Sequence, residues 1–186
     1  MLFSVAMSSL FFVGLAKIVF GFLVGVIGVF LASRLFDRLI GAQKSDDAVG
    51  EGNVSIAILK GSGLIALGVL CRNAVQSSFA ALDYLQFAGA QSWDLSAKMA
   101  LHAITHTAIA LIVGACVLAA GTLLFDKLTG GVEELKHIRA GNVAPGIVVG
   151  AVLLVLALLT APGLQTVLDG LLPVPELPEG VLPTLQ

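Results

Sequence analysis

Four long runs of apolar residues dominate the chain, and most polar residues lie between them. The runs extend from about Leu10 to Leu35, from Asn53 to about Phe79, from about Met99 to Leu124 and from Asn142 to about Leu168. About 20 mostly apolar residues suffice for a helix to cross a hydrocarbon core of roughly 30 Å. Each run therefore predicts a transmembrane helix. Transmembrane strands would be shorter and alternate in polarity, so the predicted fold class is an all-α membrane protein.

The composition excludes a soluble globular protein. Of the 186 residues, 58% are hydrophobic and 12% are charged, whereas soluble domains are roughly 25% charged. The formal net charge of -2 is too small, and the charges too dispersed, for a nucleic-acid-binding surface. No Lys or Arg precedes Val13, so we interpret the first run as a retained helix rather than a signal peptide. The expected surroundings are a lipid bilayer.

Basic residues near the ends of the spans predict the orientation, because Lys and Arg favour cytoplasmic loops. They flank the first and third loops, at Arg34, Arg38 and Lys44 and at Lys127, Lys136 and Arg139. We expect these two loops in the cytoplasm and both termini outside. Segment 172–186 contains four prolines and is expected to form an extended external tail.

The chain contains an internal repeat with a shift of 89 residues (124 − 35). This shift places Leu35–Gly41 (LFDRLIG) on Leu124–Gly130 (LFDKLTG), and Gly52-Asn53-Val54 on Gly141-Asn142-Val143, without a gap. The 186 residues then form a single membrane domain, with repeat one at about 10–82 and repeat two at about 99–171. Each repeat has two spans, so the fold is two parallel tandem helical hairpins, unlike the inverted repeats of many transporters.

Small residues recur at matching positions in the two repeats, at intervals of three, four or seven residues. Such stripes let transmembrane helices approach closely, although small residues are also simply common in these helices. Smooth faces on all four helices further predict a homo-oligomer. The expected packing glycines are Gly21, Gly25, Gly61, Gly68, Gly114, Gly121, Gly146 and Gly150.

The duplicated Leu-Phe-Asp-basic-Leu-x-Gly and Gly-Asn-Val motifs resemble those of a bacterial inner-membrane family, domain of unknown function 350, the YjfL-like proteins. The resemblance covers about Leu10 to Leu172. It implies a bacterial inner-membrane location and supplies no catalytic or binding residues. Family members are often encoded near envelope-stress and polyamine-related proteins, which implies a role in one of these processes. Lys60 and Pro145 depart from a plain apolar repeat.

The repeated motif residues have a structural and a functional interpretation. Glycines after the first and third spans can end a helix with a positive φ, and asparagines before the second and fourth can cap a helix N-terminus. The two aspartates, each followed by a base, can orient the chain at headgroup level. The alternative is that these groups line a cytoplasmic mouth or bind a partner protein. The residues are Asp37, Gly41, Asn53, Asp126, Gly130 and Asn142.

Ionisable residues inside spans are functional candidates because burying a charge there costs free energy. At 1.5 Å per residue, Lys17 and Arg72 lie near the outer interface, where their side chains can reach water. Lys60 lies about 10 Å inside the inner boundary. Its ammonium group can either extend back to that boundary or face a wet cavity or the bundle interior.

His102 and His106 lie one helical turn apart and share a face. They lack the adjacent Glu of a zincin motif and a third ligand, so no metal site or cofactor is expected. They are either interfacial histidines hydrogen-bonded to neighbouring helices or part of a pH-sensitive external vestibule. Such a vestibule would form a polar layer at the level of Lys17, Arg72, Gln76, His102, His106 and Gln165.

The sequence has no Ser-His-Asp order, phosphate-binding loop or paired intramembrane carboxylates that would suggest catalysis. Cys71 and Cys116 are expected to be free, buried thiols at different depths. We therefore expect a non-enzymatic, oligomeric inner-membrane scaffold or signalling component in envelope homeostasis, with a possible cytoplasmic partner at the two basic loops. The alternative is a small cation or polyamine channel or transporter.

Overall fold

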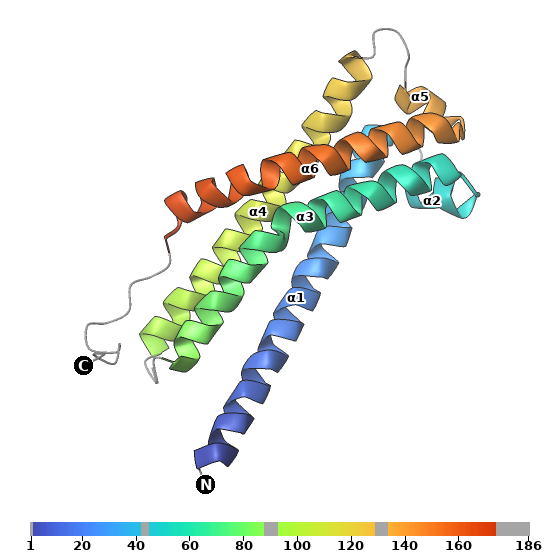
Figure 1. Cartoon of the computed structure of the whole chain (residues 1–186). Coiled ribbons are helices and arrows are strands. Elements are labelled where there is room, and N and C mark those ends of the chain that lie inside the picture. Colours follow the sequence, from blue (N-terminus) through green and yellow to red (C-terminus); the bar gives the residue numbers. More distant parts are fainter. Residues whose placement is uncertain (1, 42–44, 88–92, 129–133, 174–186) are drawn as a thin grey trace.

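The computed structural model describes residues 2–41, 45–87, 93–128 and 134–173, and within these ranges the side chains of all but 2–9 and 84–87. Six helices follow one another in these described residues (Figure 1). They are α1 (Leu2–Ile40), α2 (Ser45–Gly50), α3 (Val54–Phe87), α4 (Trp93–Leu128), α5 (Glu134–Arg139) and α6 (Val143–Leu171). The predicted tail lies outside the described residues from position 174 onward.

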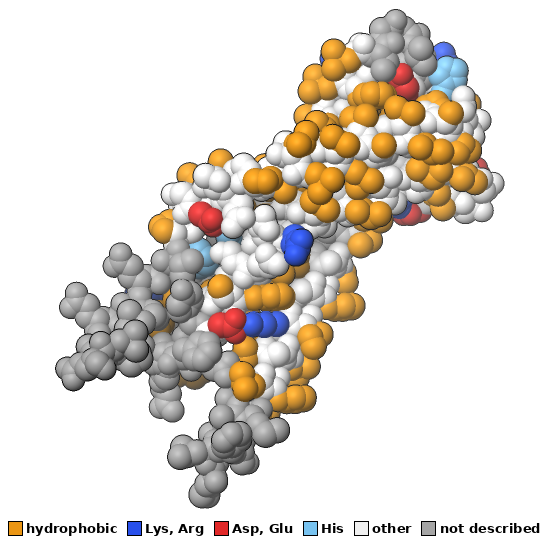
Figure 2. Space-filling view, in the orientation of Figure 1, with side chains coloured by type: hydrophobic (Ala, Val, Ile, Leu, Met, Phe, Trp, Pro, Cys, Tyr) orange, Lys and Arg blue, Asp and Glu red, His pale blue; other side chains and the backbone are white. Residues whose placement is uncertain are grey.

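Four of these helices are long and apolar enough to cross a membrane, which confirms the predicted all-α, four-span fold. The candidate spans are Leu10–Ile40, Val54–Asp83, Trp93–Leu128 and Val143–Leu171. Each is longer than the apolar run that predicted it, because the helix continues into the polar residues at the ends of the run. Over these spans the visible surface is mostly apolar, with few charged side chains (Figure 2).

The two short helices were not predicted from the sequence, which suggested loops there. Both α2 and α5 lie at the same end of the bundle, beside the first turns of α3 and α6 (Figure 1). Each occupies the same place in its repeat, between the first and the second long helix. We call this end of the bundle the loop end and the other the opposite end.

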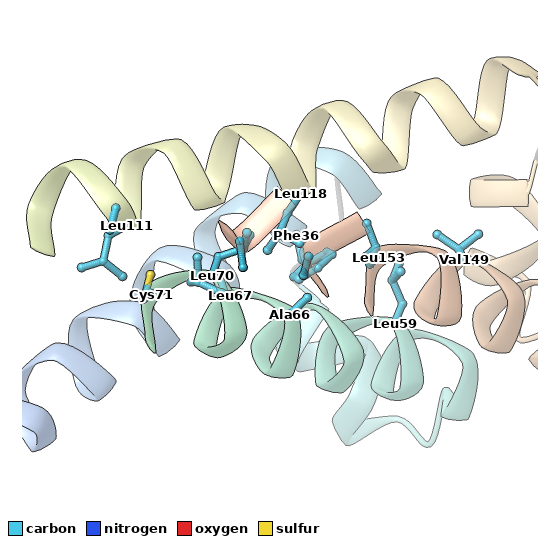
Figure 3. Packing of buried hydrophobic residues seen from close by; sticks show 14 of the residues in the cluster. Phe36, Leu59, Ala66, Leu67, Leu70, Cys71, Leu111, Leu118, Val149 and Leu153 are labelled. Carbon is cyan, nitrogen blue, oxygen red and sulfur yellow. The ribbon is translucent and has the colours of Figure 1, made fainter. Parts of the chain in front are cut away.

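The core is built around α3, which packs against α6, α4 and α1. Side chains from these helices meet where α1, α3, α4 and α6 converge, as Phe36, Leu59, Leu118 and Leu153 do in Figure 3. By contrast, α1 has an 18-residue apolar window with no buried residue. The first helix is therefore the most loosely attached of the four long helices.

Close helix approaches depend on glycines of the second repeat. A Cβ on Gly146 would lie 2.5 Å from Ser55 Oγ and 2.8 Å from the Ser55 carbonyl oxygen, so α6 and α3 touch almost backbone to backbone. Gly150 faces the side chain of Ser62, and Gly121 faces that of Leu156 in α6. The expected packing glycines of the first repeat behave differently, since a Cβ on Gly25, Gly61 or Gly68 would meet nothing within 4 Å, and one on Gly21 only Phe79.

Sequence reasoning missed one glycine that shapes the core. A Cβ on Gly63 would overlap the ring of Phe36, the aromatic residue of the first Leu-Phe-Asp motif, which is fully buried. The repeat gives no signal for it, because the equivalent residue in α6 is Val152. Pro145, by contrast, distorts nothing, because it lies in the first turn of α6, where a backbone N–H has no helical partner.

Replacing Gly146 with Ala is expected to destabilise the protein, because the new methyl group would meet the Ser55 backbone, which cannot move aside. Overpacking of this kind typically costs about 1–3 kcal/mol. Thermal unfolding in detergent micelles measures the effect. Gly61→Ala is the matched control, since it adds the same methyl group where nothing lies within 4 Å. Equal melting temperatures for the two variants would contradict the close α3–α6 approach.

Candidate functional site

The repeated aspartates each hold the start of a short helix at the loop end. Asp37 Oδ1 accepts hydrogen bonds from the Ser45 backbone N–H at 2.8 Å and from its hydroxyl at 2.7 Å. Asp126 Oδ1 accepts one from the backbone N–H of Leu135 at 3.2 Å. Each carboxylate thus satisfies N–H groups at a helix start that would otherwise lack partners. The Leu-Phe-Asp motif therefore ties the end of a span to the helix that follows it.

The Gly-Asn-Val motifs end the short helices and begin the long ones. Gly52 and Gly141 have φ of 91° and 85°, a conformation that favours glycine. The Asn53 N–H donates to the Ala48 carbonyl, and the Asn142 N–H donates to the His137 carbonyl. These two bonds close the C-terminal ends of α2 and α5.

The asparagine side chains then cap α3 and α6, as predicted. Asn53 Oδ1 accepts from the Ile56 N–H at 3.0 Å, and Asn142 Oδ1 accepts from that of Ala144 at 3.2 Å. Gly41 ends α1 with φ of 98°, whereas Gly130 lies outside the described residues.

Two hydrogen-bonded contacts tie the repeats together at this end. The Asn53 side chain donates to the carbonyls of Ile138 and Arg139, each at 3.1 Å, so the cap of α3 also holds the end of α5. Arg139 Nη2 donates to the Leu39 carbonyl at 3.2 Å, near the end of α1. These contacts join residues about one repeat apart. The loop end is thus one connected unit rather than two separate loops.

Lys60 extends back toward the loop end rather than into a cavity. Its ammonium group pairs with Asp46 of α2, whose carboxylate is exposed. Of the two arrangements left open by the sequence, the structure has the one in which the charge reaches the boundary. Asp46 belongs to an acidic exposed set on repeat one with Asp47 and Glu51, whereas α5 exposes Lys136, His137 and Arg139.

Lys17 pairs with an acid that the sequence did not single out. Its Nζ lies 2.6 Å and 2.7 Å from the two carboxylate oxygens of Asp83 in α3, and 5.7 Å from the centre of the Phe79 ring. The side chain is only partly exposed, so it uses protein partners as well as the water expected at the interface. No sequence signal linked Lys17 to Asp83, because they lie 66 residues apart in different helices.

The two histidines pack together inside the opposite half of the bundle. The rings of His102 and His106 stack with centroids 5.3 Å apart, and both residues are buried. Within the described part of the chain, His102 Nε2 and both ring nitrogens of His106 have no hydrogen-bond partner. The nearest acid is Asp169 of α6, with Oδ1 3.8 Å from His106 Nε2. This differs from the predicted histidines hydrogen-bonded to neighbouring helices.

A repeated arrangement underlies these two polar sites. The 89-residue shift maps Lys17 onto His106, and each has an acid on the second long helix of its own repeat. The shift maps Asp169 onto position 80 (169 − 89 = 80), about one helical turn before Asp83. Each repeat therefore carries a basic side chain on its first long helix facing an acidic one on its second, toward the end opposite the loops.

The predicted outer polar layer is only partly assembled in the described structure. Gln165 is exposed on α6, whereas Arg72 and Gln76 of α3 line an apolar hollow beside α1. They do not join the buried histidines. No three His, Cys, Asp or Glu residues among those described are placed to hold a metal ion. Both thiols are free, but Cys116 is exposed on α4, so the expectation that it is buried was wrong.

Family comparison agrees with the duplication. The family model described as Domain of Unknown Function (DUF350) matches residues 9–101 and, a second time, residues 98–173. The chain belongs to the DUF350 family. No curated protein and no solved structure matches it. In this DUF350 protein, the two successive matches correspond to the hairpins α1–α3 and α4–α6, each with its Asp and Gly-Asn motifs.

The two capping asparagines of this DUF350 protein are expected to differ in their contribution to stability. Asn142→Ala removes a cap, at a typical cost of about 1 kcal/mol. Asn53→Ala removes a cap and two inter-repeat hydrogen bonds, so its cost should be about 2 kcal/mol or more. Reversible unfolding in mixed micelles gives both values, and equal losses would contradict the inter-repeat role of Asn53.

Proposed function

We propose that this DUF350 protein is a non-enzymatic, homo-oligomeric protein of the bacterial inner membrane that serves as a scaffold or signalling component in envelope homeostasis. In the proposed orientation the loop end faces the cytoplasm and both termini lie outside. The basic residues of the two loops support this orientation, since cytoplasmic loops favour Lys and Arg.

The observation that carries the proposal is the construction of the loop end. Backbone hydrogen bonds close the turns after the two short helices, and the Asn53 side chain bridges the repeats, so this surface is held in place. A surface fixed in this way needs little further ordering when a partner binds, which lowers the entropic cost of binding.

The loop end also carries charges of both signs, with an acidic set around α2 and a basic set on α5. This pattern suits a cytoplasmic protein with the complementary arrangement of charges, because complementary potentials favour specific association.

Site-specific photo-crosslinking in cells tests the scaffold function. With the photoreactive residue at Asp47 or His137, both exposed at the loop end, we expect adducts with the same cytoplasmic protein. Ile112, exposed on a membrane span, is the matched control and should give no such adduct. Adducts at Ile112 alone, or none at either loop-end position, would count against a cytoplasmic partner.

A second candidate function, a small cation or polyamine channel or transporter, is favoured by one observation. In the described structure His102 Nε2 and both ring nitrogens of His106 are buried without a hydrogen-bond partner, and Asp169 lies nearby. Ionisable groups kept in such a place are costly and often belong to a pathway. Histidines that gain a proton at this site would repel passing cations.

Flux through purified protein in liposomes distinguishes this second candidate. If a pathway exists, cation flux should fall as the pH decreases through the range in which histidine titrates, because protonated rings repel cations. The double variant His102→Gln/His106→Gln should lose this pH dependence, and Lys60→Ala is compared in parallel. Assembled protein that shows no ion or polyamine flux would exclude this candidate and leave the scaffold function.

A further inference from the structure

One contact between the repeats lacks its counterpart within the chain. The 89-residue shift maps α1 onto α4 and α3 onto α6, so the counterpart of the α3–α4 contact is a contact between α6 and α1. In the described residues α3 packs along α4, whereas α6 and α1 barely meet. The faces of α3 and α4 that bury each other therefore have counterparts on α6 and α1 that are left uncovered.

The uncovered face of α6 matches a face of α3 that is fully buried. On α3 this face consists of Leu70, Ala74, Ser78 and Ala81, each at most 1% exposed. The equivalent residues, which we call the α6 face, are Leu159, Gly163, Val167 and Gly170. Leu159 is 74% exposed and Val167 is 55% exposed, and a Cβ on either glycine would meet nothing within 4 Å. Within the described structure the α6 face is therefore apolar and uncovered.

The uncovered face of α1 likewise matches a buried face of α4. On α4 the residues that receive α3 are Ala103, Thr107, Ala110 and Gly114, all buried. Their counterparts, which we call the α1 face, are Gly14, Ile18, Gly21 and Gly25. Ile18 is 69% exposed, and a Cβ on Gly14 or Gly25 would meet nothing within 4 Å.

A hollow beside the α1 face lacks the side chains that fill the equivalent position in repeat two. It has a volume of about 510 Å³ and lies between α1 and α3, with Gly21, Gly25 and Gly28 along one wall and Gly68 and Cys71 along the other. At the equivalent glycine of repeat two, no such space is left. A Cβ on Gly114 would lie 2.8 Å from Leu67 Cδ1 and 3.5 Å from Leu70 Cβ.

The side chains that fill that position have exposed or partly exposed counterparts on α6. Leu67 and Leu70 correspond to Leu156 and Leu159, and Leu159 has the greater exposure of the two. The chain thus has an unfilled hollow beside Gly25 and an exposed leucine, Leu159. In repeat two the position equivalent to the hollow, at Gly114, is filled by Leu70, the counterpart of Leu159.

We propose that α6 of a second copy of this chain docks on the α1 face, with Leu159 of that copy in the hollow beside Gly25. The contact repeats between chains the packing of Leu70 on Gly114 within one chain, and it rests on the homo-oligomer of the proposed function. A contact between two different faces closes when it is made twice in a dimer or repeats around a ring, and otherwise gives an open array. No charged residue belongs to either face, and Arg72, which also lines the hollow, is exposed.

Disulfide cross-linking between two differently tagged chains tests the contact. In a background of Cys71→Ala and Cys116→Ala, one chain carries Gly25→Cys and the other Leu159→Cys. The internal counterpart has Cβ positions 3.5 Å apart, within the range of a disulfide. We expect a disulfide-linked heterodimer in the membrane. Leu158→Cys is the matched control, since it is also exposed but lies about 100° around the helix, and should cross-link at least tenfold less.

A second variant tests the assembly without a cross-link. Gly25→Leu fills the hollow, and because nothing lies within 4 Å of its Cβ the single chain should keep its fold. Native mass spectrometry should then show loss of the oligomer, whereas Ile27→Leu, on another exposed face of α1, should retain it.

Three results would overturn the inference. An assembled protein without the Gly25–Leu159 disulfide would place the interface elsewhere and leave the homo-oligomer standing. A monomeric wild-type chain in lipid nanodiscs would refute both. A phospholipid that co-purifies with the wild type and is lost from Gly25→Leu, with no change in subunit number, would make lipid the occupant of the hollow.

Discussion

Close approach of helix backbones is the constraint on which this fold depends. In a bilayer, lipid tails are as apolar as leucine, so helices gain little from burying hydrocarbon and associate through tight packing and hydrogen bonds. Here α3 meets α6 at Gly146 and Gly150 and meets α4 at Gly114. Ser78 adds a polar contact to the second approach, with its Oγ 3.1 Å from Thr107 Oγ1 and 3.2 Å from the Ala103 carbonyl oxygen.

Polar groups are distributed according to the same constraint. Hydroxyls inside the spans bond to backbone carbonyls, as Thr122 does to Leu118 at 2.8 Å, and Lys17 and Lys60 have carboxylate partners. Away from water, a buried hydroxyl without such a bond would be left unsatisfied at considerable cost. Among the described side chains, the histidine pair and the Ser55 hydroxyl depart from this pattern, since they include buried polar atoms without a hydrogen-bond partner.

The sequence predicted the spans, the repeat and the capping asparagines because these depend on local rules: apolar length, a fixed shift and the chemistry of a helix end. It did not predict partners across helices. Asp83 lies 66 residues from Lys17, and nothing local indicates which helices will be neighbours. Repeat symmetry was also misleading in part, because it assigned equal packing roles to Gly25 and Gly114. Among the described residues, a Cβ on Gly114 would have neighbours within 4 Å, whereas one on Gly25 would have none.

The central place of α3 has a consequence for how the protein is made. This helix belongs to the first hairpin, yet most of its packing comes from α4 and α6, which are synthesised later. The cap at Asn53 likewise reaches carbonyls of Ile138 and Arg139, about half a chain downstream. While the ribosome still holds the second hairpin, the first must sit in the bilayer with its most contact-rich helix facing lipid. The first hairpin therefore reaches its final packing only after the second has been inserted.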